Sequence, residues 1–202
     1  MNMDTVLQSF PVFLLIFCRI TAFFVVVPIF SSKVVPRAFK IGISFFVSLI
    51  VFSSSGTGIT VPQDLSYILL IVREAMIGLL LGFIAFLMFM AIQTAGSLID
   101  MQIGFGIANV IDPMSGISSP IIGNFKYMIA TLIFLSVNGH HHLLNAIVNS
   151  YKWVPINNNI LIKMVNGSLS DFLVRSFAQS FVISLQMAAP LVTALFLTDI
   201  GL

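Results

Sequence analysis

An uncharged apolar run is the feature that most constrains this fold. From Ala75 to Ile99 the sequence contains no charged residue, and a helix of that length crosses the roughly 30 Å apolar core of a bilayer. Of all 202 residues, 8% are charged, against about 25% in a typical soluble domain. Because a soluble fold could not cover its surface at that charge density, we predict an integral membrane protein. A soluble enzyme and a nucleic-acid-binding domain are excluded as function classes, and no nucleic-acid partner is expected.

The apolar segments predict an all-α fold within a single membrane domain, residues 1–202. Helices are expected because an unpaired backbone group in lipid costs several kcal/mol. The fourth segment contains a helix boundary after Asn138–Gly139. The second segment and the apolar part of the fourth are too short to cross a bilayer easily, so half-helices, hairpin arms and parts of a buried assembly are all open alternatives. The predicted helical segments are 6–30, 39–52, 66–102, 121–153 and 169–199.

Charge placement gives a partial topology. Lys33, Arg37 and Lys40 form the densest basic cluster, and basic residues in short loops favour the cytoplasmic side. The N-terminus and the loop at Asp64 then lie outside. No basic region precedes the first apolar run and no signal-peptidase-type site follows it, so we expect the first segment to be retained.

Charged residues inside apolar segments are candidate assembly sites, because an Arg at mid-helix costs about 3 kcal/mol on translocon scales. Arg19 lies near the middle of the first segment, where it could anchor another helix or subunit, or could bind carbonyls and only pack. Arg73 and Glu74 begin the third segment. Adjacent helical positions point about 100° apart, so we expect these two to pair poorly with each other and each to need another partner, in this chain or a neighbouring one. Asp100 lies near the end of the same segment.

Two glycines one turn apart, Gly78 and Gly82, predict close helix packing on the third segment. Small residues at this spacing let another backbone approach. The motif does not say which helix approaches.

The region 104–123 is the most unusual stretch of the sequence. Its glycines allow backbone angles that other residues rarely adopt, and Asp112–Pro113 ends its first part sharply. Irregular backbone at membrane depth is tolerated only inside protein or beside a water-filled cavity. A pore constriction and an ordinary surface loop are both open from physics alone. The candidate constriction residues are Gly104, Phe105, Gly106, Ile107, Val110, Ile111, Asp112 and Pro113.

Catalytic and metal chemistry find little support. No nucleophile elbow, Walker A or H-E-x-x-H motif is present. Three consecutive histidines, 140–142, spread around a helix and cannot all bind one ion, so a polar patch at a helix boundary is favoured over a metal site. Cys18 is expected to be inert packing. We predict no catalytic residue, no metal and no cofactor.

Several motifs in order then identify a resemblance. They are CRITAFFVVVPIFSSKVVP (from Cys18), REAMIGLLLGF (from Arg73), QTAGSLIDMQIGFGIANVIDP (from Gln93), SPIIGNF (from Ser119), NGHHHLLNAIVNSY (from Asn138) and LQMAAPLVTALFLTDIGL (from Leu185). With them the chain resembles the FliR family, membrane components of the flagellar type III export gate, over nearly its whole length. Injectisome counterparts are similar, but the N-terminal motif and the loop resemble those of flagellar members more closely.

The resemblance implies a fold and partners that composition cannot show. Such proteins are built of bent helical hairpins and assemble with FliP and FliQ into a channel for unfolded flagellar subunits. FlhB and FlhA act at its cytoplasmic side, in the bacterial inner membrane at the flagellar basal body. The stretch 104–113 resembles the family's plug, which closes the channel at rest.

One departure from the family pattern concerns the end of the sequence. FliR proteins normally continue with a further helical hairpin, whereas this sequence stops at Leu202. We therefore expect either a truncated sequence or a shortened gene product, and the assembly and function of this 202-residue form are in question. A channel or transporter for small solutes, acting alone, is the alternative function.

Overall fold

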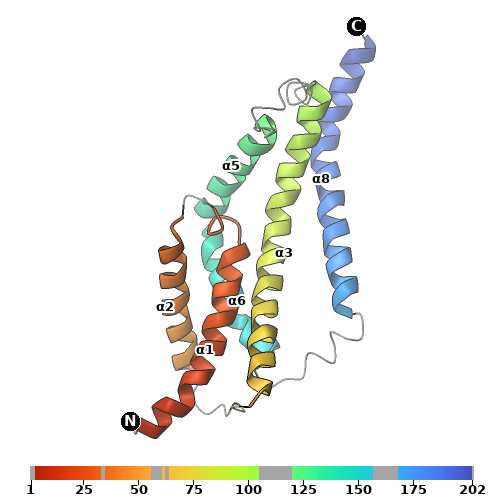
Figure 1. Ribbon diagram of the computed structural model, residues 1–202. Coiled ribbons are helices and arrows are strands. Elements are labelled where there is room, and N and C mark those ends of the chain that lie inside the picture. Colours follow the sequence, from red (N-terminus) through yellow and green to blue (C-terminus); the bar gives the residue numbers. More distant parts are fainter. Residues whose placement is uncertain are drawn as a thin grey trace, which may run out of the picture. The chain divides into compact units, whose positions relative to one another are not determined.

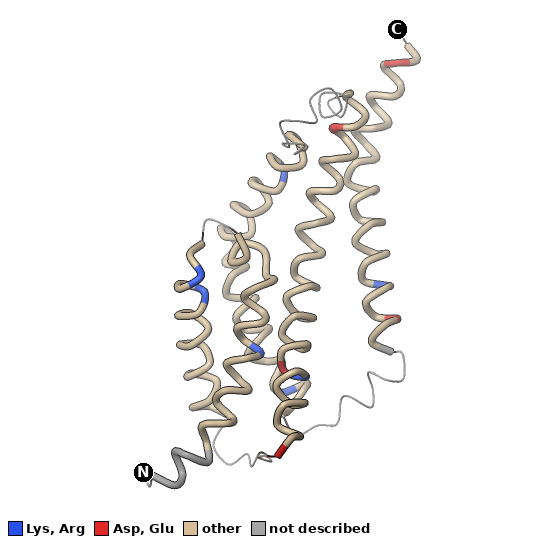
Figure 2. The backbone as a smooth tube through the Cα atoms, in the orientation of Figure 1, with Lys and Arg blue, Asp and Glu red and all other residues tan. Residues whose placement is uncertain are grey.

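The structure is a computed structural model that describes residues 3–32, 35–55, 61, 64–104, 120–156 and 168–201. These residues contain helices and no strand. Four helices are long and apolar enough to cross a membrane, and a fifth candidate is the pair α5 (Ile121–Ser136) and α6 (Gly139–Trp153), interrupted by a short break. The charged positions are few, and most of every helix is uncharged (Figure 2). The chain is thus an all-α, multi-pass membrane protein.

The chain divides into two compact units, residues 1–86 with 141–169, and residues 87–140 with 170–202. Helix α3 (Ser66–Ile103) runs through both units: its residues up to 86 belong to the first unit, and those from 87 belong to the second. The helices are α1 (Met3–Val26), α2 (Arg37–Ser55), α3 (Ser66–Ile103), α5 (Ile121–Ser136), α6 (Gly139–Trp153) and α8 (Ser168–Gly201).

The first unit packs α1 against α2, α6 and the first part of α3 (Figure 1). Residues of α1 supply most of its core, since Val12, Leu15, Ile20 and Phe23 are all about 99% buried or more. Ile147 of α6 is also fully buried in this cluster. Helix α1 is therefore the central element of the first unit.

Backbone contact joins α1 to α3. A Cβ atom on Gly78 would overlap the carbonyl oxygen of Arg19, and one on Gly82 would lie 3.0 Å from the carbonyl oxygen of Phe23. Gly78 and Gly82 therefore face α1, which is the partner that the spacing of these glycines did not identify. Dispersion contacts and close backbone approach of this kind hold membrane helices together where lipid competes for apolar surface.

The second unit packs the last part of α3 against α5 and α8. Ala95 and Ile99 of α3 form a small buried cluster with Ala188 of α8. Ring contacts add to the pairing of α3 with α5, because Phe89 lies 5.7 Å from Tyr127 and 5.4 Å from Phe134 between ring centroids. In this unit α3 therefore contacts α8 mainly through small residues and contacts α5 through aromatic rings.

Helix ends differ from the predicted ones in two places. Helix α1 stops at Val26 rather than Phe30, since Pro28 cannot donate a helical hydrogen bond, and Ile29 adopts a positive φ of 49°. The prediction that the second segment is short was wrong. Helix α2 has 19 residues and extends through Ser53, Ser54 and Ser55, because serine inside a helix costs less than about 0.7 kcal/mol relative to alanine and so does not by itself end one.

The other predicted segments lie close to the observed helices. Helices α3 and α8 begin and end within two residues of the predicted bounds. The predicted segment 121–153 is two helices, separated at Val137 and Asn138. Asn138 has a φ of 57°, a left-handed conformation in which asparagine commonly ends a helix.

Gly78→Ala should destabilise the protein by about 1–3 kcal/mol, the usual range for forced overpacking. The new methyl group meets a carbonyl oxygen of α1, which cannot rotate away. Thermal unfolding of the detergent-purified protein measures the effect. The matched control is Gly42→Ala on α2, where nothing lies within 4 Å of a Cβ, and which should be neutral or slightly stabilising. Equal unfolding temperatures for the two variants would contradict the proposed α1–α3 contact.

Candidate functional site

Two groups of buried polar residues stand out from the apolar helices, one in each unit. The first contains Arg19, Arg73 and Glu74, and the second contains Asp100. All four side chains are at least 95% buried. A charge in such surroundings is tolerated only with partners, so the partners define what each group does.

Arg19 joins three helices of the first unit. Its Nε donates to Glu74 Oε2 on α3 at 2.5 Å, its Nη1 donates to Ser150 Oγ on α6 at 3.1 Å, and its Nη2 donates to the carbonyl oxygen of Val154 at 3.0 Å. The guanidinium also stacks over the ring of Tyr151, 4.0 Å from its centroid. Arg19 therefore does not extend to the protein surface. All of its recorded partners lie within this chain.

Arg73 binds the same carboxylate from the other side. Its Nη2 donates to Glu74 Oε1 at 3.2 Å and to the carbonyl oxygens of Pro155 and Ile156 at 2.9 and 2.7 Å. Arg73 and Glu74 do pair, although they were expected to pair poorly, and each also has another partner, as expected. The Cα–Cβ directions of adjacent residues do diverge, but the arginine side chain is long enough to turn back to the neighbouring carboxylate.

The two arginines thus share one carboxylate inside the helix bundle. Two positive charges and one negative charge leave a net charge of +1, and backbone carbonyls of residues 154–156 supply the remaining negative ends of dipoles. Sequence reasoning missed Ser150, Tyr151 and these carbonyls. The only indication of these residues in the sequence was the polar Asn-Ser-Tyr-Lys motif, residues 149–152, at the end of an otherwise amphipathic segment.

Asp100 joins α3 to the start of α5 in the second unit. The backbone N–H of Ile122 donates to both carboxylate oxygens at 3.1 and 3.0 Å, and the N–H of Gly123 donates to Oδ2 at 3.2 Å. Pro120 occupies the N-cap position of α5 and offers no side-chain acceptor. A carboxylate from α3 therefore performs the capping role, at the end of the helix where a negative charge is stabilised.

Close backbone contact accompanies this cap. A Cβ on Gly96 would overlap the backbone of Gly123, and a Cβ on Gly123 would lie 3.0 Å from the carbonyl oxygen of Gln93. The glycine pair lets α3 and α5 approach closely enough for Asp100 to reach the amides of α5. The small cluster Thr94-Ala95-Gly96-Ser97 was the sequence signal for this crossing, and sequence reasoning did not use it.

The predicted plug lies mostly outside the described residues. Only Gly104 is described, and it ends α3 with a φ of 87°, which favours glycine. The other candidates named above, Phe105 to Pro113, fall in the stretch 105–119, which the structure does not describe. Helix α3 ends on one side of this stretch and α5 begins on the other, and Asp100 binds the start of α5 directly to α3.

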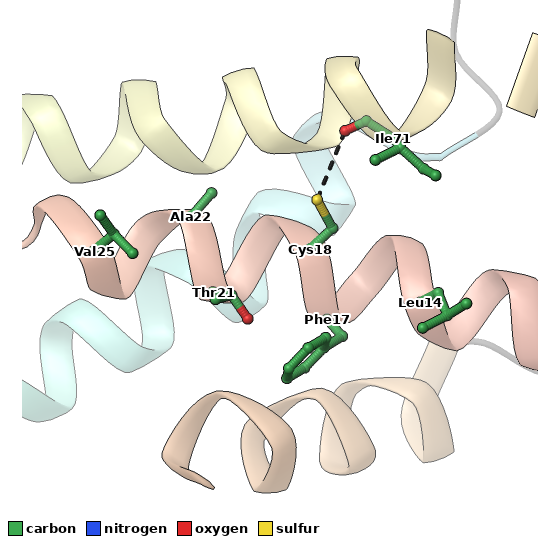
Figure 3. A pocket seen from close by; sticks show the side chains of 7 residues that line it. All are labelled: Leu14, Phe17, Cys18, Thr21, Ala22, Val25 and Ile71. Atoms are coloured by element: carbon green, nitrogen blue, oxygen red, sulfur yellow. Dashed lines mark hydrogen bonds between the residues drawn. The ribbon is translucent and has the colours of Figure 1, made fainter. Parts of the chain in front are cut away.

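A pocket of about 430 Å³ opens on α1 of the first unit (Figure 3). Cys18 points toward α3, and its thiol donates to the carbonyl oxygen of Ile71 at 3.8 Å (Figure 3). The lining contains no charged group, so nothing in it polarises a substrate or binds an ion. Its residues are Leu14, Phe17, Cys18, Thr21, Ala22, Val25 and Ile71.

Among the described residues, histidine, cysteine and carboxylate side chains do not gather in any group of three that could hold a metal ion. His140, His141 and His142 lie in the first turn of α6. The buried polar groups described above all join helices to one another.

Comparison with known proteins identifies the family. Residues 10–202 match the family described as bacterial export proteins, family 1. The chain belongs to this export family. It is 44% identical to the flagellar biosynthetic protein FliR of Bacillus subtilis (strain 168), over 99% of this chain and 77% of the relative. It is 29% identical to FliR of Escherichia coli (strain K12), over 91% and 69%.

The export family also reaches beyond flagella. The chain is 30% identical to the Yop proteins translocation protein T of Yersinia pestis, over 98% of this chain and 76% of the relative. This chain is therefore a component of a flagellar or type III export system. In this chain, the buried polar groups hold the membrane helices together.

Glu74→Gln should destabilise this export protein more than Arg73→Gln does. Removing the carboxylate leaves two arginines buried without a counter-charge, whereas removing Arg73 leaves the Arg19–Glu74 pair intact. Breaking a buried pair typically costs about 3–5 kcal/mol. Membrane abundance and thermal unfolding in detergent report the difference. If Arg73→Gln proves equally or more damaging, Glu74 is not the shared counter-charge.

Asp100→Ala should release the start of α5 while the rest of the export protein stays folded. Loss of a helix cap costs about 0.5–2 kcal/mol, so the amides of Ile122 and Gly123 should exchange with deuterium roughly 2- to 30-fold faster. Asp171→Ala, in the exposed first turn of α8, is the control and should leave both amides unchanged. Unaltered exchange in Asp100→Ala would argue against the cap.

Proposed function

We propose that this protein is a core subunit of the flagellar type III export gate, assembling with FliP and FliQ into a channel for unfolded flagellar subunits. The observation that carries the proposal is the family match over residues 10–202 together with 44% identity to a flagellar relative over almost the whole chain. The flagellar assignment is favoured because the relative matched at 44% identity is a flagellar protein, whereas the Yop proteins translocation protein T, at 30%, is about as distant as FliR of Escherichia coli, at 29%.

The proposal places the protein in the bacterial inner membrane at the flagellar basal body, with FlhB and FlhA as further partners. The apolar helices support a membrane location. The role is not enzymatic: the buried polar groups of the described residues join helices to one another, and none of them is arranged as a nucleophile with a base.

The stretch 104–113 acts as the plug in this proposal. Phe105, Ile107, Val110 and Ile111 supply a soft apolar seal, and the glycines lower the strain of displacing it. The contact between Asp100 and the start of α5 supports this role, because it fixes the two helices between which the stretch runs. A plug needs a fixed base if it is to return to the same closed position after each substrate passes.

The test uses a strain whose own gene for this protein is removed, in which flagellin in the medium and motility should both be lost. The intact gene should restore both. A tagged copy should co-purify with FliP and FliQ as one complex, measured by native mass in detergent. Normal flagellin secretion without the gene would overturn the proposed function.

A gene lacking codons 104–112 tests the plug in the same strain. We expect a membrane that leaks small ions, with secretion partly preserved, because the seal is lost while the channel wall stays. Ion leakage is measured with a potential-sensitive dye. Background leakage in cells that contain the assembled complex would refute the plug but leave the gate assignment standing.

A further inference from the structure

Helix α8 carries a polar stripe on a face that packs against nothing in its own unit. The stripe consists of Arg175, Gln179, Val182, Gln186, Ala189 and Thr193, and all six are exposed. Successive members are four, three, four, three and four residues apart, so they lie along one side of the helix. Four of the six carry polar groups.

The other faces of α8 look different. Ser184 and Ala188 are buried, and Ala188 packs against Ala95 and Ile99 of α3. Bulky apolar side chains accompany the packed residues on that side of the helix, because Phe177 and Phe181 lie in register with Ser184 and Ala188. The apolar set, Phe177, Phe181, Leu185 and Phe196, is 45–60% exposed, as expected for contact with lipid. The polar stripe is thus distinct from both the packed face and the apolar face.

Pro190 adds a second polar feature to the stripe. It lies inside α8, has no N–H, and so cannot bond the carbonyl oxygen of Gln186 four residues earlier. Gln186 therefore presents a side-chain amide and a carbonyl oxygen that lacks its usual helical donor. In hydrocarbon each unsatisfied group of this kind costs several kcal/mol, so this face of α8 does not face lipid.

The length of the stripe favours water over a partner helix. From Arg175 to Thr193 it extends about 27 Å at 1.5 Å per residue, close to the roughly 30 Å apolar thickness of a bilayer. A helix–helix contact in a membrane requires only one or two polar groups and favours small residues along the seam. Three of the six members of this stripe, Arg175, Gln179 and Gln186, are instead long, flexible polar side chains.

We propose that the Arg175–Thr193 stripe of α8 lines a water-filled passage, along which an unfolded polypeptide moves in contact with uncharged amide and hydroxyl groups. Polar intramembrane residues usually face a water-filled cavity or the interior of a bundle. Such groups can exchange hydrogen bonds with any peptide backbone, which suits a passage that accepts many sequences. This assignment of a passage wall rests on the proposed export function.

Thiol labelling in cells containing the assembled gate tests the stripe. Cys18 is the only cysteine, so Cys18→Ala gives a cysteine-free parent. Gln186→Cys, Ala189→Cys and Thr193→Cys place thiols on the stripe. Leu185→Cys and Leu191→Cys are the controls, at nearly the same depths but on other exposed parts of α8. A charged, membrane-impermeant methanethiosulfonate is the probe.

Stripe thiols should react at least about tenfold faster than the controls, because the reactive thiolate forms only where water reaches the sulfur. Ala189→Cys changes the side chain least, so it decides the question if Gln186→Cys fails to accumulate. Equal rates on the stripe and control positions would overturn the proposal, whether both are slow, as for a stripe packed on a partner helix, or both are fast.

Secretion by the same strains separates the two proposals. If the cysteine variants secrete flagellin but the stripe thiols do not label preferentially, the passage wall is wrong and the export function stands. If the intact gene does not support secretion, the export function fails, while the labelling pattern still reports which face of α8 meets water.

Discussion

The first unit depends on one carboxylate held between two arginines. Glu74 lies on α3, Arg19 lies on α1, and Arg73 extends from α3 to the carbonyls after α6. Inside an apolar bundle, none of these charges is stable alone. The three helices must therefore come together in one register, because any slip along a helix axis would separate a charge from its partner. Apolar packing also holds the helices together, but it distinguishes less strongly than the charge pairs between one helix register and another.

Glycine contacts make this electrostatic arrangement possible. Gly78 lies one turn after Glu74 on α3 and contacts the backbone of Arg19 itself. The close approach of the two backbones brings the guanidinium to the carboxylate at hydrogen-bonding distance. The second unit repeats the combination with other residues, since Gly96 lies one turn before Asp100 and contacts the start of α5 that Asp100 caps.

The sequence predicts the class of fold well and the partners of its polar residues poorly. Hydropathy located the uncharged apolar run of α3, Ala75–Ile99, because about 20 apolar helical residues cross a bilayer, and the predicted bounds of α3 and α8 agree with the observed ones within two residues. It also marked Arg19, Glu74 and Asp100 as costly residues that need partners. It could not supply those partners, since Ser150 and the carbonyl of Val154 are distant in sequence and backbone carbonyls leave no mark in composition. The pairing of Arg73 with Glu74 was misjudged because helical periodicity describes Cβ directions and not the reach of a long side chain.

A common pattern explains where the polar residues of this chain lie. Polar groups that join helices, such as Glu74 and Asp100, are buried and have several partners within the chain. Gln186 and Thr193 differ, because they are exposed on a helix whose neighbouring faces are either packed or bulky and apolar. An uncharged amide or hydroxyl is less costly to remove from water than a carboxylate, but without a partner it still costs a few kcal/mol in hydrocarbon, so the exposed ones require a polar environment outside the chain. In the proposed export gate, the passage for unfolded substrates supplies such an environment.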